Sequence, residues 1–382
     1  MPPAPAPPPP GGPRARALLL AAAAAACPRG AAASATFLAG LGWRTFDKAG
    51  IETAVGFVNL TMDPASMTNA LTLGRTFTVQ SSAFTCNVAQ RLDAATGRLA
   101  SYVVPEGEGD EISKLPYLTN VYAADASGRL LSSVAQSTPW DVTSVADAPG
   151  AGPDVSFGLG TRPPMDINLP VFVVVLNSSS GLVENVTDAI PGVLDAEECA
   201  SAAGSSPGSG AGTLLFVNNR MHVNPFHRMM DVILFDVGTR TVANVLNYPY
   251  GILSAITGWR NRTSGEALAL AFAWPAVGSD GPALVAFDPA AKSWDATVRV
   301  VWAFDKSVLP MPHCLAVDGD AGTDAVYGLL EGSDCPPNCF QDIQLASFFN
   351  VSSPAGFSMT KVFIGPPLEK TFSTGIGQCA VV

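Results

Sequence analysis

The chain has 382 residues and a mass of 39.4 kDa; 48% of its residues are hydrophobic and only 14% are charged. This apolar content excludes an intrinsically disordered chain, and 36 Gly with 32 Pro are too many for a protein of long helices. The 32 acidic and 21 basic residues give a net charge of −11, which argues against nucleic acid as a partner. The length allows one large domain or two to three ordinary ones.

Residues 1–35 have the order of a secretory signal peptide. Arg14 and Arg16 precede the apolar run Ala17–Cys27, and the small residues Ala33–Ala35 form an A-x-A cleavage site. The run is too short to span a bilayer. Cleavage before Thr36 leaves residues 36–382 as the mature domain, with a net charge of −14 because three arginines are removed from the −11. An organelle transit peptide, a plain Ala-rich leader and a lipoprotein acylated at Cys27 are the alternatives.

The cysteines and glycosylation sequons favour the same secretory route. Removal of Cys27 leaves an even number of cysteines, which in an exported protein predicts disulfides, with buried free thiols as the alternative. The disulfide candidates are Cys86, Cys199, Cys314, Cys335, Cys339 and Cys379. The N-x-[ST] sequons, more numerous than composition predicts by chance, are Asn59, Asn177, Asn185, Asn261 and Asn350. We therefore expect a secreted, extracellular glycoprotein without a membrane anchor.

Five segments share one pattern: an apolar β-rich run, a polar turn and a second β-rich run. In chain order they are Val121–Gln136, Val171–Asp188, Val232–Tyr248, Leu284–Phe304 and Leu345–Phe363. Each predicts a β-hairpin whose turn opens with an Asx residue and closes with Gly, Pro or Ser. The turn-opening residues are Asp125, Asn177, Asp236, Asp288 and Asn350, spaced by 52 to 62 residues.

An earlier pair of β-rich runs precedes these hairpins, as in Leu253–Thr257 and Ala267–Trp274. Four strands in about 50–60 residues is the size of one blade of a β-propeller, whereas an immunoglobulin-like sandwich needs about 100 residues. We therefore predict an all-β, single-domain propeller of about six four-stranded blades, with seven as the alternative. A last strand near Phe372–Val382 is expected to complete the first blade. Val193–Ala203 is compatible with a short helix and Ser201–Gly212 with a Gly/Ser-rich loop.

The turns themselves resemble a known superfamily. Asp93-AATGR, Asp125-ASGR and Asp288-PAAKSW are similar to the blade hairpins of quinoprotein-like and kelch-like β-propellers. The Gly-Gly of kelch repeats is absent from the mature chain, and Trp140-Asp141 and Trp294-Asp295 occur without the Gly-His of WD repeats. The resemblance therefore implies the propeller shape, with a central channel, and no particular family.

Arg220, His222 and His227 form the most polar candidate site in the chain. On a loop between strands, the two imidazoles could act as acid and base or as metal ligands. The His-x₄-His spacing matches no standard zinc motif, and no carboxylate adjoins it in sequence. A surface loop without a specific role is the alternative.

Two further clusters have metal-binding alternatives. Asp318, Asp320 and Asp324 surround a Gly between two β-rich runs, which suits either a calcium loop or a simple polar turn. His313-Cys314 with Cys335 and Cys339 could supply four zinc ligands, but in an oxidising compartment disulfides are the better interpretation. No cofactor is predicted; calcium at Asp318, Asp320 and Asp324 is kept as an alternative.

The sequence contains no nucleophile elbow, phosphate-binding loop or dinucleotide fingerprint. The first functional hypothesis is a secreted binding or scaffold module for an extracellular protein or a small ligand. The alternative is a propeller enzyme, such as a hydrolase or lactonase, with its site at the central channel. A third hypothesis is a fragment of a larger surface protein.

Overall fold

The computed structural model describes the strands and some of the turns between residues 35 and 381. Its backbone covers 35–47, 50–63, 68–73, 77–80, 88–93, 98–103, 117–124, 130–148, 151–152, 154–162, 169–195, 202–205, 212–221, 228–274, 281–304, 312–317, 324–331, 343–365 and 371–381. Side chains are described within residues 131–359, with gaps. The predicted leader, residues 1–35, lies outside this range except for Ala35, where the first strand begins.

The described elements are β-strands and one short 3₁₀ turn, η2 (Pro354–Gly356). No helix in the described part of the chain has the length and hydrophobicity to cross a membrane. The strands pair antiparallel into sheets, each named here after the strand at its inner edge. The β27 sheet contains β27 (Thr371–Val381), β1 (Ala35–Asp47), β2 (Gly50–Asp63), β3 (Thr68–Leu73) and β4 (Phe77–Gln80). The β5 sheet contains β5 (Val88–Asp93), β6 (Arg98–Val103), β7 (Tyr117–Ala124) and β8 (Leu130–Thr138).

The next sheets follow in chain order. The β9 sheet contains β9 (Asp141–Asp147), β10 (Val155–Thr161), β12 (Phe172–Asn177) and β13 (Val183–Asn185), and beside it β11 (Leu169–Pro170) pairs with β14 (Leu194–Asp195). The β15 sheet contains β15 (Ala202–Ser205), β16 (Thr213–Met221), β17 (Arg228–Asp236) and β18 (Thr241–Tyr248). The β19 sheet contains β19 (Ile252–Arg260), β20 (Ala267–Trp274), β21 (Ala283–Phe287) and β22 (Arg299–Ala303). The β23 sheet contains β23 (Pro312–Val317), β24 (Ala325–Glu331), β25 (Ile343–Phe349) and β26 (Ser358–Gly365).

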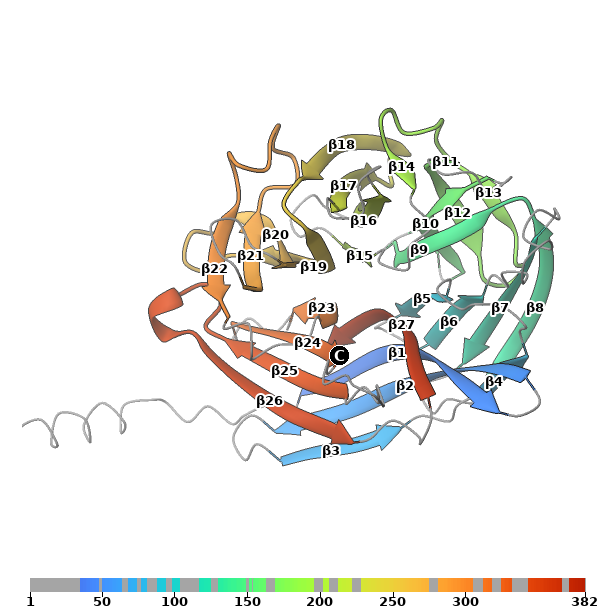
Figure 1. Cartoon of the computed structure of the whole chain (residues 1–382), viewed down its shortest axis with the longest axis horizontal. Helices are drawn as coiled ribbons and strands as arrows, with labels where there is room; N and C mark the ends of the chain where they lie inside the picture. The colour runs from blue at the N-terminus through green and yellow to red at the C-terminus, as the bar shows by residue number, and fades with distance from the viewer. Residues whose placement is uncertain are drawn as a thin grey trace, which may run out of the picture.

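The inner strands meet one another around a common centre. β5 contacts β9, β9 contacts β15, β15 contacts β19, β19 contacts β23, β23 contacts β27, and β27 returns to β5. Figure 1 shows the sheets arranged around this centre in the order of the chain. A closed circle of radial antiparallel sheets is the architecture of a β-propeller, so the predicted all-β fold class is confirmed.

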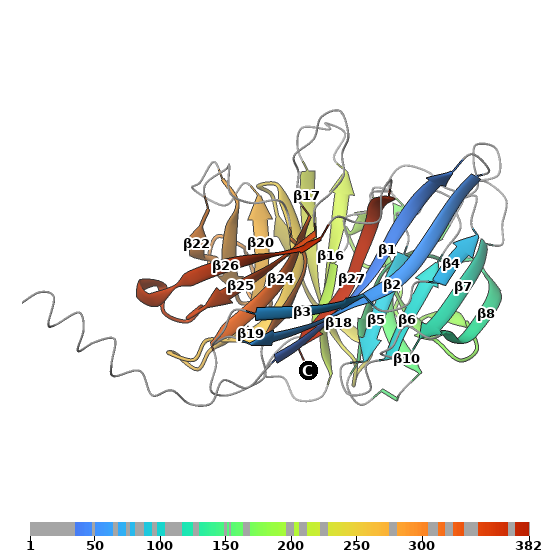
Figure 2. The ribbon, with the colours of Figure 1, turned by 90° about the horizontal axis from the view of Figure 1, so that it is seen from below.

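The circle is closed by the C-terminal strand. β27 pairs antiparallel with β1, from Phe37 opposite Val381 to Thr45 opposite Thr371, and Figure 2 shows the two strands side by side. This confirms that a strand from the end of the chain completes the first sheet. It also removes an unpaired inner edge, which would otherwise be open to aggregation.

The five predicted hairpins are confirmed, and each joins the third and fourth strands of its sheet. Their turn-opening residues either end the third strand, as Asn177 and Asp236 do, or follow it directly, as Asp288 does. The predicted number of blades is only partly met. Four blades, the β9, β15, β19 and β23 sheets, are described with packed side chains, whereas the β5 and β27 sheets are described chiefly by backbone pairing.

The short helix compatible with Val193–Ala203 is wrong at both of its ends. Leu194–Asp195 forms strand β14, and Ala202–Ser205 forms β15, which pairs with Leu214–Val217 of β16. The expected Gly/Ser-rich loop therefore contains an inner strand. Its small residues suit this place, because strands crowd together near the centre and leave little room for side chains.

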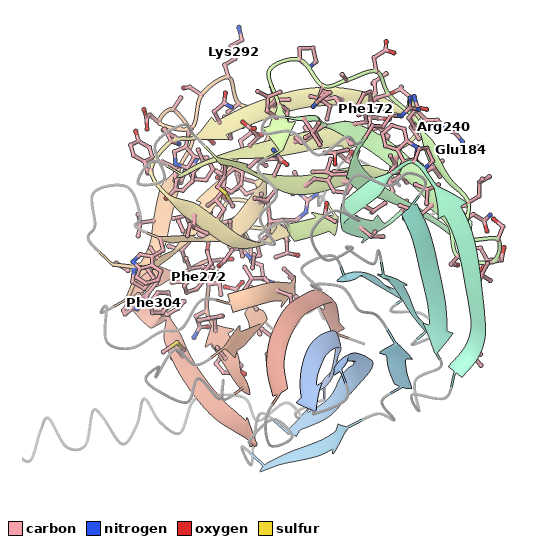
Figure 3. The ribbon with its side chains drawn as sticks, turned by 45° about the vertical axis from the view of Figure 1, so that its right-hand side comes forward. Phe172, Glu184, Arg240, Phe272, Lys292 and Phe304 are labelled. Carbon is pink, nitrogen blue, oxygen red and sulfur yellow. The ribbon has the colours of Figure 1, made fainter. Side chains whose placement is uncertain are left out.

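The core lies between neighbouring sheets. One cluster packs the β15 sheet against the β19 sheet, where Trp294 lies 4.6 Å from Tyr248 and 4.5 Å from Phe287 between ring centroids. Another packs the β19 sheet against the β23 sheet, where Phe272 and Phe304 are stacked at 5.3 Å. Both rings are buried, and Figure 3 labels them near each other at the left of the view, whereas the charged Glu184, Arg240 and Lys292 lie at the rim. Aromatic rings thus supply much of the contact that holds the sheets together.

Candidate functional site

The predicted polar site lies at the end of the β16–β17 hairpin. Arg220 is the last residue but one of β16 and pairs with Met229, and Met221 pairs with Arg228 to close the hairpin. His222 and His227 lie outside the described residues, and the side chain of Arg220 is not described. In sequence, His222 follows Met221 and His227 precedes Arg228, the last pair of the hairpin.

A row of polar residues lies three residue pairs away from the last pair of this hairpin. Asn218 of β16, Asp231 of β17 and Asn247 of β18 are opposite one another in the strand register. Asp231 is fully buried and Asn218 is 1% exposed, whereas Asn247 is exposed. The Asn247 side-chain amide donates a hydrogen bond to Oδ1 of Asp231. The row thus runs from the protein surface at β18 into the interior at β17 and β16.

The polar row faces the neighbouring β9 sheet. Leu214, Phe216 and Ile233, which alternate along β16 and β17 in phase with the row, pack into the cluster between the β9 and β15 sheets. Nδ2 of Asn218 donates to the backbone oxygen of Leu194 in β14, at 3.0 Å. At this end, polar contacts therefore replace the apolar packing of the interface between the two sheets.

A buried carboxylate is costly unless hydrogen bonds compensate its lost hydration. Asp231 receives such a bond from Asn247 and makes a further interaction within the fold. The arrangement therefore fixes the inner part of the β16–β17 hairpin, and a rigid base is what a binding loop requires. Sequence reasoning missed this row, although a signal existed: Asn218 lies two residues after the buried Phe216, and Asp231 lies two residues before the buried Ile233.

Two tyrosines continue β18 beyond the polar row. Tyr248 is fully buried in the cluster between the β15 and β19 sheets, and this burial raises its pKa well above the usual range. Tyr250 is 39% exposed and donates to Oδ1 of Asp295 at 2.5 Å, a hydrogen bond that raises its pKa. Both phenols therefore stay protonated at neutral pH, and Tyr250 acts as a donor.

The predicted calcium residues are only partly described. Asp318 and Asp320 lie outside the described residues, and Asp324 directly precedes β24. Oδ2 of Asp324 accepts from the backbone N–H of Ser352 at 2.6 Å, and its Oδ1 accepts from the Ser352 hydroxyl at 3.0 Å. Asp324 therefore holds the β25–β26 turn, a role that the sequence did not suggest. Among the described residues, no three His, Cys, Asp or Glu side chains gather in a metal-binding cluster.

The predicted cysteine framework remains a prediction as a whole. Cys314 lies on β23 and is buried. Cys379 lies on β27 opposite Ala39, with its side chain undescribed. Cys86, Cys199, Cys335 and Cys339 lie outside the described residues. No pairing between two particular cysteines is assigned.

The sequons lie on strands and turns of the sheets. Asn59 is on β2, and its side chain is not described. Asn185 is exposed on β13 and donates to the backbone oxygen of Thr187 at 3.4 Å. Asn177, Asn261 and Asn350 each open a turn between two strands.

The described side chains of the inner strands are mostly apolar or small. They are Val142, Ser144, Val145 and Ala146 on β9, the β19 residues from Ile252 to Trp259, and Cys314 to Val317 on β23. Leu253 and Ile256 of β19 pack into one sheet interface, and Ala255 and Trp259 into the next. These inner strands thus contribute chiefly to the core.

The fold defines the protein as a β-propeller with a polar end on its β15 sheet. No family model matches the sequence, and no curated protein matches it. Several solved structures resemble the chain at low sequence identity. TolB from Acinetobacter baumannii has 11% identity and a TM-score of 0.47, covering 91% of this chain and 66% of its own. The chain thus spans slightly less than two thirds of TolB.

Two further structures belong to enzymes. An apocarotenoid oxygenase of Synechocystis has 9% identity and a TM-score of 0.42, covering 86% of this chain and 72% of its own. A luciferin-regenerating enzyme has 9% identity and a TM-score of 0.40, covering 80% of this chain and 91% of its own. The activities in these names belong to those proteins.

Proposed function

We propose that the protein is a secreted, glycosylated and disulfide-containing β-propeller that binds an extracellular protein or small ligand. The six sheets around the centre would then be six blades of one ring. The observation that carries the binding role is the fully buried Asp231, held by Asn247 beneath the hairpin that bears Arg220, His222 and His227. A fixed base under a polar loop is the arrangement of a recognition site.

The inner strands β19 and β23, whose side chains the structure describes in large part, support binding at this end over chemistry at the centre. Leu253, Ala255 and Ile256 of β19 and Leu315 of β23 are buried apolar residues committed to the sheet interfaces. A hydrolase or lactonase would need acid and base groups that converge on one bond. The enzyme remains the second candidate, because the hairpin combines two imidazoles with a buried carboxylate at its base.

The first experiment tests the compartment. The full chain is expressed in eukaryotic cells, and the medium is analysed by intact mass and N-terminal sequencing. We expect a secreted protein that begins at Thr36 and loses mass on treatment with an endoglycosidase. A product that stays in the cell with residues 1–35 attached overturns the secretory part of the proposal.

The second experiment separates binding from catalysis. The secreted protein is screened by thermal shift against small ligands and assayed with a panel of simple esters and lactones. We expect a ligand that raises the Tm of the wild type and has no effect on the His222→Ala/His227→Ala variant, without turnover of any ester. Turnover that the same variant abolishes would establish the enzyme instead.

A further inference from the structure

Two sequon turns of the propeller are built alike. Asn177-Ser-Ser-Ser-Gly-Leu182 joins β12 to β13, and Asn261-Arg-Thr-Ser-Gly-Glu266 joins β19 to β20. In both turns the backbone N–H of the first residue donates a hydrogen bond to the backbone oxygen of the last. The distance is 3.0 Å from Asn177 to Leu182 and 2.9 Å from Asn261 to Glu266. The glycine of each turn, Gly181 or Gly265, has a φ of 73° or 75°, a conformation that glycine adopts without strain.

The asparagine side chain plays the same part in both turns. Oδ1 of Asn177 accepts from the backbone N–H groups of Ser179 and Ser180, each at 3.0 Å. Oδ1 of Asn261 accepts from Thr263 and Ser264, at 2.8 and 3.0 Å. Such a turn uses only the acceptor oxygen of the amide.

The nitrogen of these two amides is the atom to which an N-linked glycan attaches. In the described part of the chain, Nδ2 of Asn177 and Nδ2 of Asn261 make no hydrogen bond, so a glycan can leave the turn intact. Asn350 differs, because its Nδ2 donates to the backbone oxygen of Gly356 at 2.9 Å and closes the β25–β26 turn. The structure therefore separates sequons that the sequence pattern leaves equivalent.

The turns lie on one face of the propeller, joined by contacts from sheet to sheet. The backbone N–H of Ser178 donates to the backbone oxygen of Asp154 at 2.9 Å. The neighbouring Val155 and Val237 of the β17–β18 turn both pack against the cluster between the β9 and β15 sheets. Asn244 of β18 donates to the backbone oxygen of Pro289 at 2.8 Å, which reaches the segment between β21 and β22.

The contacts continue from the β19 sheet to the β23 sheet. The backbone N–H of Arg262 donates to the hydroxyl of Ser352 at 2.8 Å, and Thr263 Oγ1 donates to the Ser352 backbone oxygen at 3.2 Å. The face thus runs without a break from the Asn177 turn to the Asn261 turn. The β16–β17 hairpin end at Met221 and Arg228 lies at the opposite end of the sheets, because β16 starts at this face with Thr213 opposite Asp236.

We propose that Asn177 and Asn261 carry N-linked glycans, which make this turn face the glycan-covered side of the propeller. The inference rests on the proposed secretory route. It leaves the opposite end, with the β16–β17 hairpin, as the side open to a ligand. The glycans also supply hydration to a chain in which only 14% of residues are charged.

The test uses the full chain secreted from eukaryotic cells and glycopeptide mass spectrometry. We expect glycans at Asn177 and Asn261, and loss of one glycan mass in each of the variants Asn177→Asp and Asn261→Asp. Aspartate keeps the acceptor oxygen of the turn, so the Tm of the enzymatically deglycosylated variants should match that of the deglycosylated wild type. The matched controls Ser180→Ala and Ser264→Ala change the same turns but keep both sequons, and should retain both glycans.

The outcomes separate this inference from the secretory proposal. A secreted protein with glycans at Asn59, Asn185 or Asn350 but at neither turn would overturn the inference alone. A secreted protein without any glycan would also overturn it. A chain that is retained in the cell with its leader uncleaved would defeat the secretory route on which the inference depends.

Discussion

Gly158 gives the sharpest test of the packing within a blade. It lies on β10 between β9 and β12, opposite Val145 on one side and Val174 on the other. A Cβ at this position would be 2.3 Å from the backbone oxygen of Ser144 and 3.2 Å from Cδ1 of Leu176. The obstacle is a backbone atom, so rotation of a side chain cannot relieve the contact.

The distances set the expected cost of Gly158→Ala. Real Cβ contacts below 3.0 Å are essentially never seen. β9 and β10 must therefore move apart until the 2.3 Å contact between this Cβ and the Ser144 oxygen lengthens to at least 3.0 Å. Overpacking a core costs about 1–3 kcal/mol, and a clash with the backbone belongs at the top of that range. We expect the free energy of unfolding to fall by about 3 kcal/mol.

The assay is urea unfolding followed by tryptophan fluorescence, with two matched glycine variants. Gly328→Ala occupies the equivalent place on β24, where the Cβ would lie 3.1 Å from Cδ2 of the flexible Leu315 side chain and 3.3 Å from the backbone oxygen of Cys314. Both contacts are longer than the 2.3 Å contact at Gly158, so this variant should cost about 1 kcal/mol. Gly192→Ala has no atom within 4 Å but a φ of +75°, so its cost of about 1 kcal/mol comes from the backbone alone. The reasoning is refuted if Gly158→Ala costs no more than Gly192→Ala.

Three further predictions concern the polar row, the surface and the closure of the ring. A double-mutant cycle of Asp231→Ala and Asn247→Ala should give a coupling of about 2 kcal/mol in urea unfolding, and a value near zero would contradict the hydrogen bond. The Arg299 guanidinium, which donates a hydrogen bond to the Glu266 carboxylate, holds the pKa of Glu266 below the ordinary 4.5. The contribution of this ion pair to the free energy of unfolding is therefore present above pH 4.5 and is lost as pH falls through the lower folded pKa of Glu266. In the Glu266→Gln variant, Tm should therefore decrease less steeply as the pH is lowered below 4.5. The same dependence of Tm on pH as in the wild type would contradict this. Thr45→Cys with Thr371→Cys should form a disulfide that changes mobility on a non-reducing gel, whereas a pair offset by one residue should not.

The hairpins could be predicted because their signals are local. Asx residues open the turns and apolar runs flank them, so the positions of Asp236 and Asp288 are set by residues close in sequence. β15 could not be predicted in the same way. Its small residues have little strand propensity, and only the partner β16 and the crowded centre make Ala202–Ser205 a strand.

Only the local part of the candidate site could be predicted from the sequence. Arg220, His222 and His227 stand out as a polar cluster in the sequence, but Asp231 and Asn247 are separated by a turn and look like ordinary strand residues. Their meeting depends on the register of β17 and β18, which the sequence does not specify residue by residue. A polar residue two positions from a buried apolar residue on the same strand would predict such a buried polar contact.

Turn chemistry also explains why sequons are frequent in this chain. Asn opens a turn with its side-chain oxygen, and Ser or Thr two residues later suits the same bend, so N-x-[ST] is also a turn pattern. In the Asn350 turn both sequon residues serve the fold: Nδ2 of Asn350 bonds Gly356, and Ser352 binds Asp324 and receives the backbone N–H of Arg262. In the Asn177 and Asn261 turns, the Nδ2 atom to which a glycan would attach makes no hydrogen bond to the described residues. The use of that single atom, more than the number of sequons, therefore indicates where the glycans should lie.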